Sequence, residues 1–226
     1  MSLSKLGLHC QQIPGWVPSL VNMSAMNWIK VIDPPSINPF PGKKTIGRIY
    51  VPDNESNNMV LHGTVGAEEW YSRCSSGYQK APWVWCWEGP NEPAVQTAAQ
   101  RKSLVEFTRR WVQLMHNAKM RTVALCLSTG WPDVGYAPEL AGSLMDTDYW
   151  ALHEYAAPTM QSQESWLCLR YRRTVKEIQA IGIRVPPLLI TECGIDGGVA
   201  GKPRAGWKSF ASMEEYLAQL HWYDLE

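Results

Sequence analysis

The sequence predicts an α/β protein with a TIM-type (β/α)8 barrel fold that lacks the eighth strand and helix at its C-terminus. Two observations lead to this prediction. Seven short apolar runs alternate with connections, several of them long and amphipathic, and such alternation is typical of a parallel sheet with right-handed crossovers. The first run is followed by QQIPGW at residues 11–16, whereas an open doubly wound sheet would place a Gly-rich phosphate loop there. A closed barrel is therefore favoured.

The expected strands are short apolar runs, as in a parallel sheet that is covered on both faces. In chain order they cover residues 6–10, 25–32, 45–51, 83–87, 122–127, 149–153 and 188–191. The connection at residues 34–44 contains four prolines and is too short for a proper helix, so we expect a loop or a single turn there.

Helices are expected where apolar side chains recur at steps of three and four residues. The clearest case covers residues 94–118 and contains Leu104, Phe107, Trp111, Leu114 and Met115. Residues 165–181 repeat the pattern with Trp166, Leu169, Val175 and Ile178. After the seventh run come a loop at residues 193–210 and a helix at residues 211–223.

No eighth strand follows that last helix. The 226 residues also fall short of the about 250 that a typical barrel needs. We therefore interpret residues 1–226 as one barrel domain that is incomplete at its C-terminus. Such a barrel exposes two unpaired parallel edges, and self-association through these open edges is expected.

Composition excludes several function classes. Twenty-one basic and 21 acidic residues give no net charge, whereas proteins that bind nucleic acid or anionic membranes normally carry a basic excess. The longest apolar runs, at residues 83–87 and 185–190, are far shorter than the roughly 20 residues of a membrane helix. Residues 1–8 have no signal-peptide pattern, so the expected location is cytoplasmic, or secreted if a signal peptide has been removed.

The six cysteines are interpreted as reduced, buried residues, since Cys10, Cys86, Cys126 and Cys193 lie in or at the end of apolar runs. No CxxC or HxxxH pair occurs, so neither a metal site nor a cofactor is expected.

Catalytic groups of a barrel lie at the carboxyl ends of strands and in the loops that follow. This criterion selects Asp33, Asp53, Glu55, Asn91, Glu92, His153, Glu154, Tyr155, Glu192 and Asp196. Glu92, in WEGPNEP after the fourth run, and Glu192, in LITECG after the seventh, stand out. A glutamate directly after buried aliphatic residues is costly unless the strand opens into a polar site.

The pair Asn91-Glu92 and the segment Thr191-Glu192-Cys193-Gly194 resemble the fourth- and seventh-strand motifs of clan A glycoside hydrolases. One hundred residues separate the two glutamates, about three βα units. His153-Glu154-Tyr155 resembles the His-x-Tyr segment near the nucleophile of several of these families, and Arg48 resembles an active-site arginine.

The resemblance implies a catalytic domain that cleaves a beta-linked glycan or glycoside with retention of configuration. In that mechanism Glu192 is the nucleophile and Glu92 the general acid/base, and Asn91 binds the 2-hydroxyl of the sugar. We expect Tyr155 to hydrogen-bond Glu192, and His153 and Arg48 to lie at the sugar. The two carboxyls need different pKa values, so the negative charge of Glu192 and partial burial should raise the pKa of Glu92.

The twelve tryptophans include candidate sugar platforms in loops, Trp131 and Trp207, although tryptophan more often simply packs. Glu88 is a rival for the acid or a partner behind it. Two other functions remain open: a non-catalytic carbohydrate-binding barrel, and a metal-dependent hydrolase that uses His9 and His153.

Overall fold

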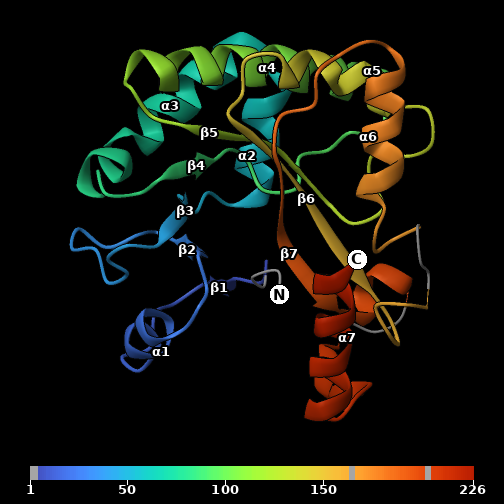
Figure 1. The fold of residues 1–226 in the computed structure, drawn as a ribbon. Helices are drawn as coiled ribbons and strands as arrows, with labels where there is room; N and C mark the ends of the chain where they lie inside the picture. The colour runs from blue at the N-terminus through green and yellow to red at the C-terminus, as the bar shows by residue number, and fades with distance from the viewer. Residues whose placement is uncertain (1–4, 163–165, 202–204) are drawn as a thin grey trace.

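The structure is a computed structural model that describes residues 5–162, 166–201 and 205–226 (Figure 1). Its strands form one parallel sheet in which each strand pairs with the next along the chain. The strands are β1 (Leu8–Cys10), β2 (Trp28–Ile32), β3 (Lys44–Arg48), β4 (Cys86–Glu88), β5 (Thr122–Leu127), β6 (Tyr149–Ala156) and β7 (Leu188–Ile195). The sheet curls into a nearly closed barrel, which confirms the predicted fold without its eighth unit.

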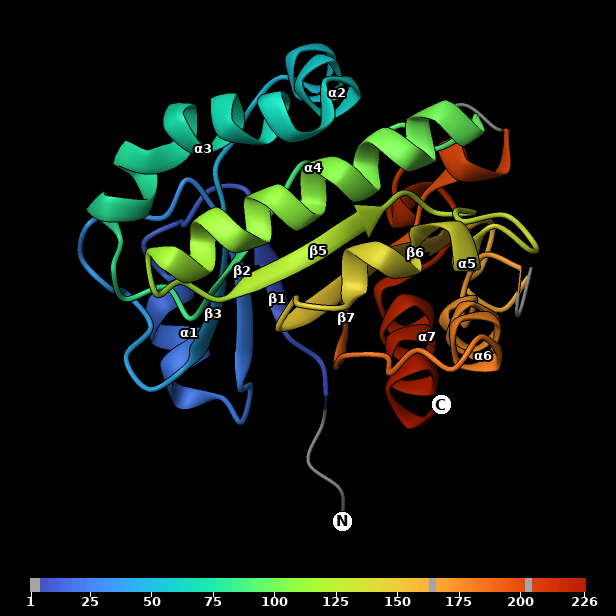
Figure 2. The ribbon, with the colours of Figure 1, turned by 90° about the horizontal axis from the view of Figure 1, so that it is seen from above.

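Helices cover the outside of the sheet (Figure 2). They are α1 (Val17–Met23), α2 (Asp53–Leu61), α3 (Gly63–Lys80), α4 (Ala98–Asn117), α5 (Ala137–Leu140), α6 (Tyr171–Ala180) and α7 (Met213–Leu225). Short 3-10 turns cover Ala141–Leu144, Gly197–Ala200 and Trp207–Ser209. The longest helix, α4, begins with a capping box in which Thr97 and Gln100 satisfy each other's backbone N–H groups. It buries the predicted apolar stripe that includes Leu104, Phe107 and Trp111.

Helix bounds were predicted for α4, α6 and α7 only, so α1, α2, α3 and α5 are additional. Helices α2 and α3 join β3 to β4. The buried face of α3 combines the small residues Gly63, Gly66 and Ala67 with Trp70 and Tyr78, and the small residues weaken its apolar pattern in the sequence. The Pro-rich stretch between β2 and β3 is a loop, as predicted. Helix α6 begins at Tyr171 rather than at residue 165, which lies outside the described residues; the left-handed φ of +60° at Leu169 precludes a continuous helix before it.

The interior matches the expectation of free cysteines. All six are free, and five are buried; Cys193 is partly exposed. Within the described ranges no helix is long and apolar enough to cross a membrane.

The barrel is open between β1 and β7. In the part of the chain that the structure describes, these two strands share no ladder of hydrogen bonds, and only side chains meet across the opening. The residues of β7 from Leu188 to Ile190 are only partly buried, and Leu217 of the neighbouring α7 is exposed. Partly buried apolar residues therefore lie on an unpaired strand, and the helix that follows this strand exposes a leucine; both features favour association with another chain.

Self-association through this opening is a prediction that sedimentation velocity can check. We expect the sedimentation coefficient to rise with protein concentration, and Leu217→Lys to weaken that rise because it places a charge on the apolar surface. Val134→Lys is a matched control, since Val134 (57% exposed) and Leu217 (55%) are equally accessible and Val134 lies in the loop after β5. Identical, concentration-independent coefficients for all three proteins would contradict the prediction.

Glu154 attaches α7 to the outer face of the barrel. Its carboxylate accepts hydrogen bonds from the backbone N–H of Leu169 (2.6 Å) and Tyr171 (2.8 Å) and from the hydroxyl of Tyr223 (2.6 Å) in α7. Glu154 alternates with the inward-facing His153 and Tyr155 along β6, so it points away from the barrel interior. Its place among the strand-end candidates for catalysis is therefore wrong.

Glu154→Gln should destabilise the protein by about 1–3 kcal/mol. The amide nitrogen cannot accept a hydrogen bond, so at least one of the three buried donors would lose its partner. Chemical denaturation of the two proteins measures the difference. Glu55→Gln, at a carboxylate that pairs with the equally exposed Arg73, is the control and should cost less, because water can replace the lost contact. An equal or smaller loss for Glu154→Gln would contradict this role.

Candidate active site

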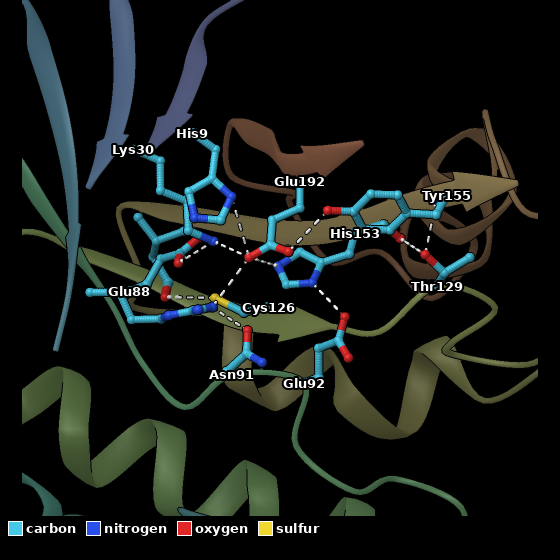
Figure 3. Close-up of polar contacts among 12 residues, drawn as sticks. His9, Lys30, Glu88, Asn91, Glu92, Cys126, Thr129, His153, Tyr155 and Glu192 are labelled. Carbon is cyan, nitrogen blue, oxygen red and sulfur yellow. Dashed lines mark hydrogen bonds and ion pairs between the residues drawn. The ribbon is translucent and has the colours of Figure 1, made fainter. Parts of the chain in front are cut away.

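A cluster of polar side chains fills the interior of the barrel near the carboxyl ends of its strands (Figure 3). Alternation along each strand turns these side chains inward, since neighbouring residues of a strand face opposite sides of a sheet. The cluster contains His9 of β1, Lys30 of β2, Arg48 of β3, Glu88 of β4, Asn91 and Glu92 of the following loop, His153 and Tyr155 of β6, and Glu192 of β7. Residues far apart in the sequence thus meet in one small volume.

Glu192 is the most densely contacted carboxylate of this cluster, with a side chain only 14% exposed. Its Oε1 lies 2.8 Å from Lys30 Nζ and 3.3 Å from Arg48 Nη1. Two imidazole nitrogens lie farther from the same oxygen, His153 Nε2 at 3.7 Å and His9 Nδ1 at 3.8 Å. The hydroxyl of Tyr155 donates to Oε2 at 3.1 Å, which confirms the predicted hydrogen bond.

These contacts decide the charge of Glu192. Burial alone would raise its pKa, but the neighbouring His153 and Lys30 outweigh burial and hold the pKa well below its ordinary value. Burial and the charge of Lys30 lower the pKa of His9 to about 4, so His9 is neutral at neutral pH. Glu192 is therefore an ionised carboxylate inside the barrel, as a nucleophile requires.

Glu92 lies on the other side of the same imidazole. Its Oε1 is 2.7 Å from His153 Nδ1, and its side chain is 36% exposed. Figure 3 shows the ring of His153 between Glu92 and Glu192. One histidine thus links both predicted catalytic carboxylates, one of them open to solvent and the other largely enclosed.

The predicted direction of the Glu92 pKa shift is wrong. Burial and the charge of Glu192 raise it as expected, but the hydrogen bond and the charge of His153 are stronger, and the pKa lies below its ordinary value. The sequence could not show this, because the deciding contact joins residues 61 positions apart.

A bulge in β5 shapes the backbone at Glu92. Leu125 and Cys126 have φ values of +72° and +44°, and the register with β6 shifts between Ala124 and Leu127. The carbonyl of Cys126 accepts the backbone N–H of Glu92 at 3.1 Å, and Glu92 itself has a φ of +42°. Left-handed conformations are unfavourable for residues other than glycine and tend to cluster at functional sites.

Asn91 and Arg48, both expected at the sugar, contact each other. Arg48 Nη1 donates to the Asn91 side-chain oxygen and also contacts Glu192. Arg48 therefore links the loop after β4 to the carboxylate of β7.

Lys30 was missed by the sequence reasoning, which treated its segment only as a strand. The available signal was a single charge within the apolar run WIKVI, since a buried lysine needs a partner. Its partners are Glu192 and Glu88, whose Oε2 lies 2.8 Å from Lys30 Nζ. Glu88 is fully buried, and burial is outweighed by Lys30 and Arg48, so its pKa is lowered. An enclosed, ionised Glu88 is a partner behind the site and not a rival acid.

The other candidates lie outside this cluster of contacts. Trp131 is partly buried against the main core, and Trp207 stacks on Tyr216 with ring centroids 5.0 Å apart. Asp33 accepts the backbone N–H of Tyr50. Three further acids support loops or helices: Asp53 begins α2, Glu55 pairs with Arg73, and Asp196 accepts the backbone N–H of Gly198.

The described residues contain no group of three or more His, Cys, Asp or Glu side chains arranged to hold a metal ion. His9 and His153 both approach Glu192 instead.

Comparison with solved structures shows the same barrel in glycoside hydrolases. No family model and no curated protein sequence matches the chain. ScGas2 superposes with a TM-score of 0.54 at 14% identity, over 85% of this chain and 50% of its own. PbGH5A, a family 5 glycoside hydrolase from Prevotella bryantii, gives 0.53 at 10% identity, over 88% of this chain and 70% of its own. A GH128 curdlan-specific exo-beta-1,3-glucanase from Blastomyces gilchristii gives a TM-score of 0.50 at 16% identity, over 84% of this chain and 76% of its own.

These similarities confirm the resemblance at the level of the fold. The chain spans only half the length of ScGas2. The fold of the chain is the (β/α)8 barrel of the glycoside hydrolases, without its eighth unit.

Proposed function

We propose that this protein is a retaining glycoside hydrolase that cleaves a beta-linked glycan or glycoside. One observation carries the proposal: an ionised, enclosed glutamate and a partly exposed glutamate lie on either side of one histidine at the carboxyl ends of the strands. Two carboxylates at the catalytic face of a barrel, one on either side of a sugar's reacting carbon, are what double displacement needs. The fold shared with solved glycosidases supports it.

In the first half of the reaction Glu192 attacks the anomeric carbon, and Glu92 protonates the departing oxygen. A covalent glycosyl-enzyme forms on Glu192. In the second half Glu92 takes a proton from water, which attacks the same carbon and releases Glu192. Asn91 hydrogen-bonds the 2-hydroxyl of the sugar in this proposal, which is supported by its contact with Arg48, itself in contact with Glu192.

The contact between His153 and Glu92 favours the carboxylate form of Glu92, which is the base of the second half. The acid of the first half requires a proton on Glu92, which its partly exposed side chain can take from solvent. The low pKa of Glu92 means that this protonated form is lost early as the pH rises, so the reaction should be fastest below neutral pH.

The test is hydrolysis of a panel of aryl β-glycosides and β-1,3-, β-1,4- and β-1,6-linked oligosaccharides, with the anomeric configuration of the first product read by NMR. A β-configured product supports the proposal. An α-configured product would assign an inverting mechanism, and binding of the oligosaccharides without hydrolysis would favour a carbohydrate-binding barrel. The β-1,3 substrates are included because a structure with a similar fold is named as a β-1,3-glucanase.

Replacing His153 should shift the pH profile in a defined direction. Activity falls as the pH rises through the pKa of the acid Glu92, and His153 lowers that pKa. In His153→Gln the alkaline limb of kcat/KM should therefore move to higher pH, although the rate at the optimum falls. His116→Gln, at an exposed histidine on α4 paired with Asp148, is the control and should leave the limb in place. An unmoved limb in His153→Gln would show that Glu92 is not the titrating acid.

A further inference from the structure

Two buried residues of the site, Lys30 and Glu88, have no part in the mechanism above. The Lys30 side chain is 2% exposed and that of Glu88 is fully buried. Lys30 Nζ lies 2.8 Å from Glu88 Oε2 and 2.8 Å from Glu192 Oε1, and it donates a hydrogen bond to the latter. One ammonium group therefore lies between two carboxylates in a part of the barrel that water barely reaches.

The two oxygens of Glu192 have different surroundings. Lys30, Arg48 and the two nearby imidazoles all approach Oε1. Oε2 accepts one hydrogen bond, from the neutral hydroxyl of Tyr155. Positive charge beside an oxygen holds its electron pairs, so Oε1 is the weaker nucleophile of the two.

Glu88 balances the charge behind this arrangement. Lys30 and Arg48 carry two positive charges, and Glu88 and Glu192 carry two negative ones. Without Glu88, the ammonium would be drawn to Glu192 alone and would hold that carboxylate more tightly. A buried cation paired on both sides is also fixed in place, because leaving either partner would expose an unpaired charge to the interior.

We propose that Lys30, held by Glu88, is the positioning residue of Glu192: it fixes Oε1 and leaves Oε2 as the oxygen that bonds to the anomeric carbon. This inference rests on the proposed glycosidase function. In the step concerned, the Oε2–carbon bond forms as the bond from that carbon to the glycosidic oxygen breaks. The departing oxygen takes its proton from Glu92, so no further reactant is needed.

The charged and titratable groups around Glu192 come from every strand of the barrel. They are His9 of β1, Lys30 of β2, Arg48 of β3, Glu88 and Glu92 at β4, Cys126 of β5, and His153 and Tyr155 of β6, with Cys193 next along β7. Burial acts to raise the pKa of Glu192, and Lys30 lowers it both by its charge and by its hydrogen bond.

The double variant Lys30→Met/Glu88→Met tests the proposal. It replaces a buried ion pair by apolar side chains of similar size, which proteins often tolerate without loss of stability. Two measurements are made on it and on the wild type: the carboxyl titration of Glu192 by carbon-13 NMR, assigned by comparison with Glu192→Gln, and the pH profile of kcat/KM. We expect the titration midpoint of Glu192 to rise by about one to three pH units. The acid limb of the kcat/KM profile should move to higher pH together with this midpoint. The value of kcat should fall by a larger factor than KM changes.

Two further variants sharpen the result. Lys30→Arg keeps the positive charge and should return the midpoint toward the wild-type value. Arg110→Met/Glu68→Met removes an ion pair between α3 and α4 on the outside of the barrel and should leave both readouts unchanged.

The outcomes separate this inference from the proposed function. A Glu192 midpoint that does not move in the double variant overturns the role of Lys30, whether or not the enzyme is active. Hydrolysis by the wild type together with an unmoved midpoint therefore upholds the proposed function and rejects the inference. A midpoint that rises in the double variant, together with a wild type that hydrolyses none of the substrates, upholds the contact between Lys30 and Glu192 and rejects the proposed function.

Discussion

Glu192→Gln is expected to lower kcat/KM for aryl β-glycosides by on the order of 10⁴-fold or more, since removing a nucleophile eliminates the covalent route. Glutamine has nearly the same shape, and its amide oxygen can still accept the proton of Tyr155 or Lys30. The neutral amide has no negative charge with which to attack an anomeric carbon. The protein should therefore fold and bind glycosides but not turn them over, which initial rates and ligand titrations measure.

A surface carboxylate provides the control for this experiment. Glu68 of α3 is half-exposed and pairs with Arg110 on the outside of the barrel, so Glu68→Gln should have wild-type kinetics. Activity that survives in Glu192→Gln would show that Glu192 is not the nucleophile. Loss of activity together with an altered circular dichroism spectrum would point to misfolding, and Glu192→Asp would then be compared, which keeps the charge but moves it by one methylene.

Strand positions were predicted best where the strand is apolar throughout. The run at residues 122–127 coincides with β5, and all six of its residues are buried. Strands β6 and β7 were predicted too short, because their apolar runs stop before Glu154 and Glu192. Both strands continue to Ala156 and Ile195, because Glu192 has its partners inside the barrel and Glu154 has hydrogen-bond donors on the outer side.

The members of the site were largely predictable, and so was the ionised state of Glu192, but the direction of the Glu92 pKa shift was not. A polar residue at a strand end is visible in the sequence, and this criterion brought together Glu92, His153 and Glu192. Lys30 escaped it because its side chain reaches the site from within β2. The direction of the Glu92 pKa shift depends on whether His153 or Glu192 lies closer to Glu92. The spacing of residues along the sequence does not give these distances.

Glu192 and Glu92 share one neighbour that lowers both pKa values, and they differ in their other surroundings. His153 favours the ionised form of both carboxyls. Glu192 is enclosed and also receives the charge and the hydrogen bond of Lys30, whereas Glu92 is more exposed to solvent. A second cation suits a nucleophile that must remain charged, and exposure to solvent suits a residue that must exchange a proton twice per turnover.

Glu92→Ala is expected to separate substrates by their leaving groups. A natural glycan or an alkyl glycoside leaves as a basic alkoxide and needs protonation, so its kcat/KM should fall by about 10²–10⁴-fold. An aryl glycoside with an acidic phenol can depart unprotonated, and its first step should change little. The second step still lacks its base, so the glycosyl-enzyme should accumulate and give a burst of phenol followed by slow turnover.

Added azide should then restore turnover of the activated aryl glycoside in Glu92→Ala, because this anion attacks without a general base and fits the space that the side chain leaves. The product should be a glycosyl azide of β configuration, formed on the face from which water normally attacks the Glu192 adduct. The alkaline limb of kcat/KM should disappear, since Glu92 is the acid whose deprotonation produces it. A uniform loss across all leaving groups, with no burst and no azide product, would mean that Glu92 holds the substrate and transfers no proton. The mechanism would then need another acid. The first candidate to test by substitution would be His153, which lies 2.7 Å from Glu92 and 3.7 Å from Glu192.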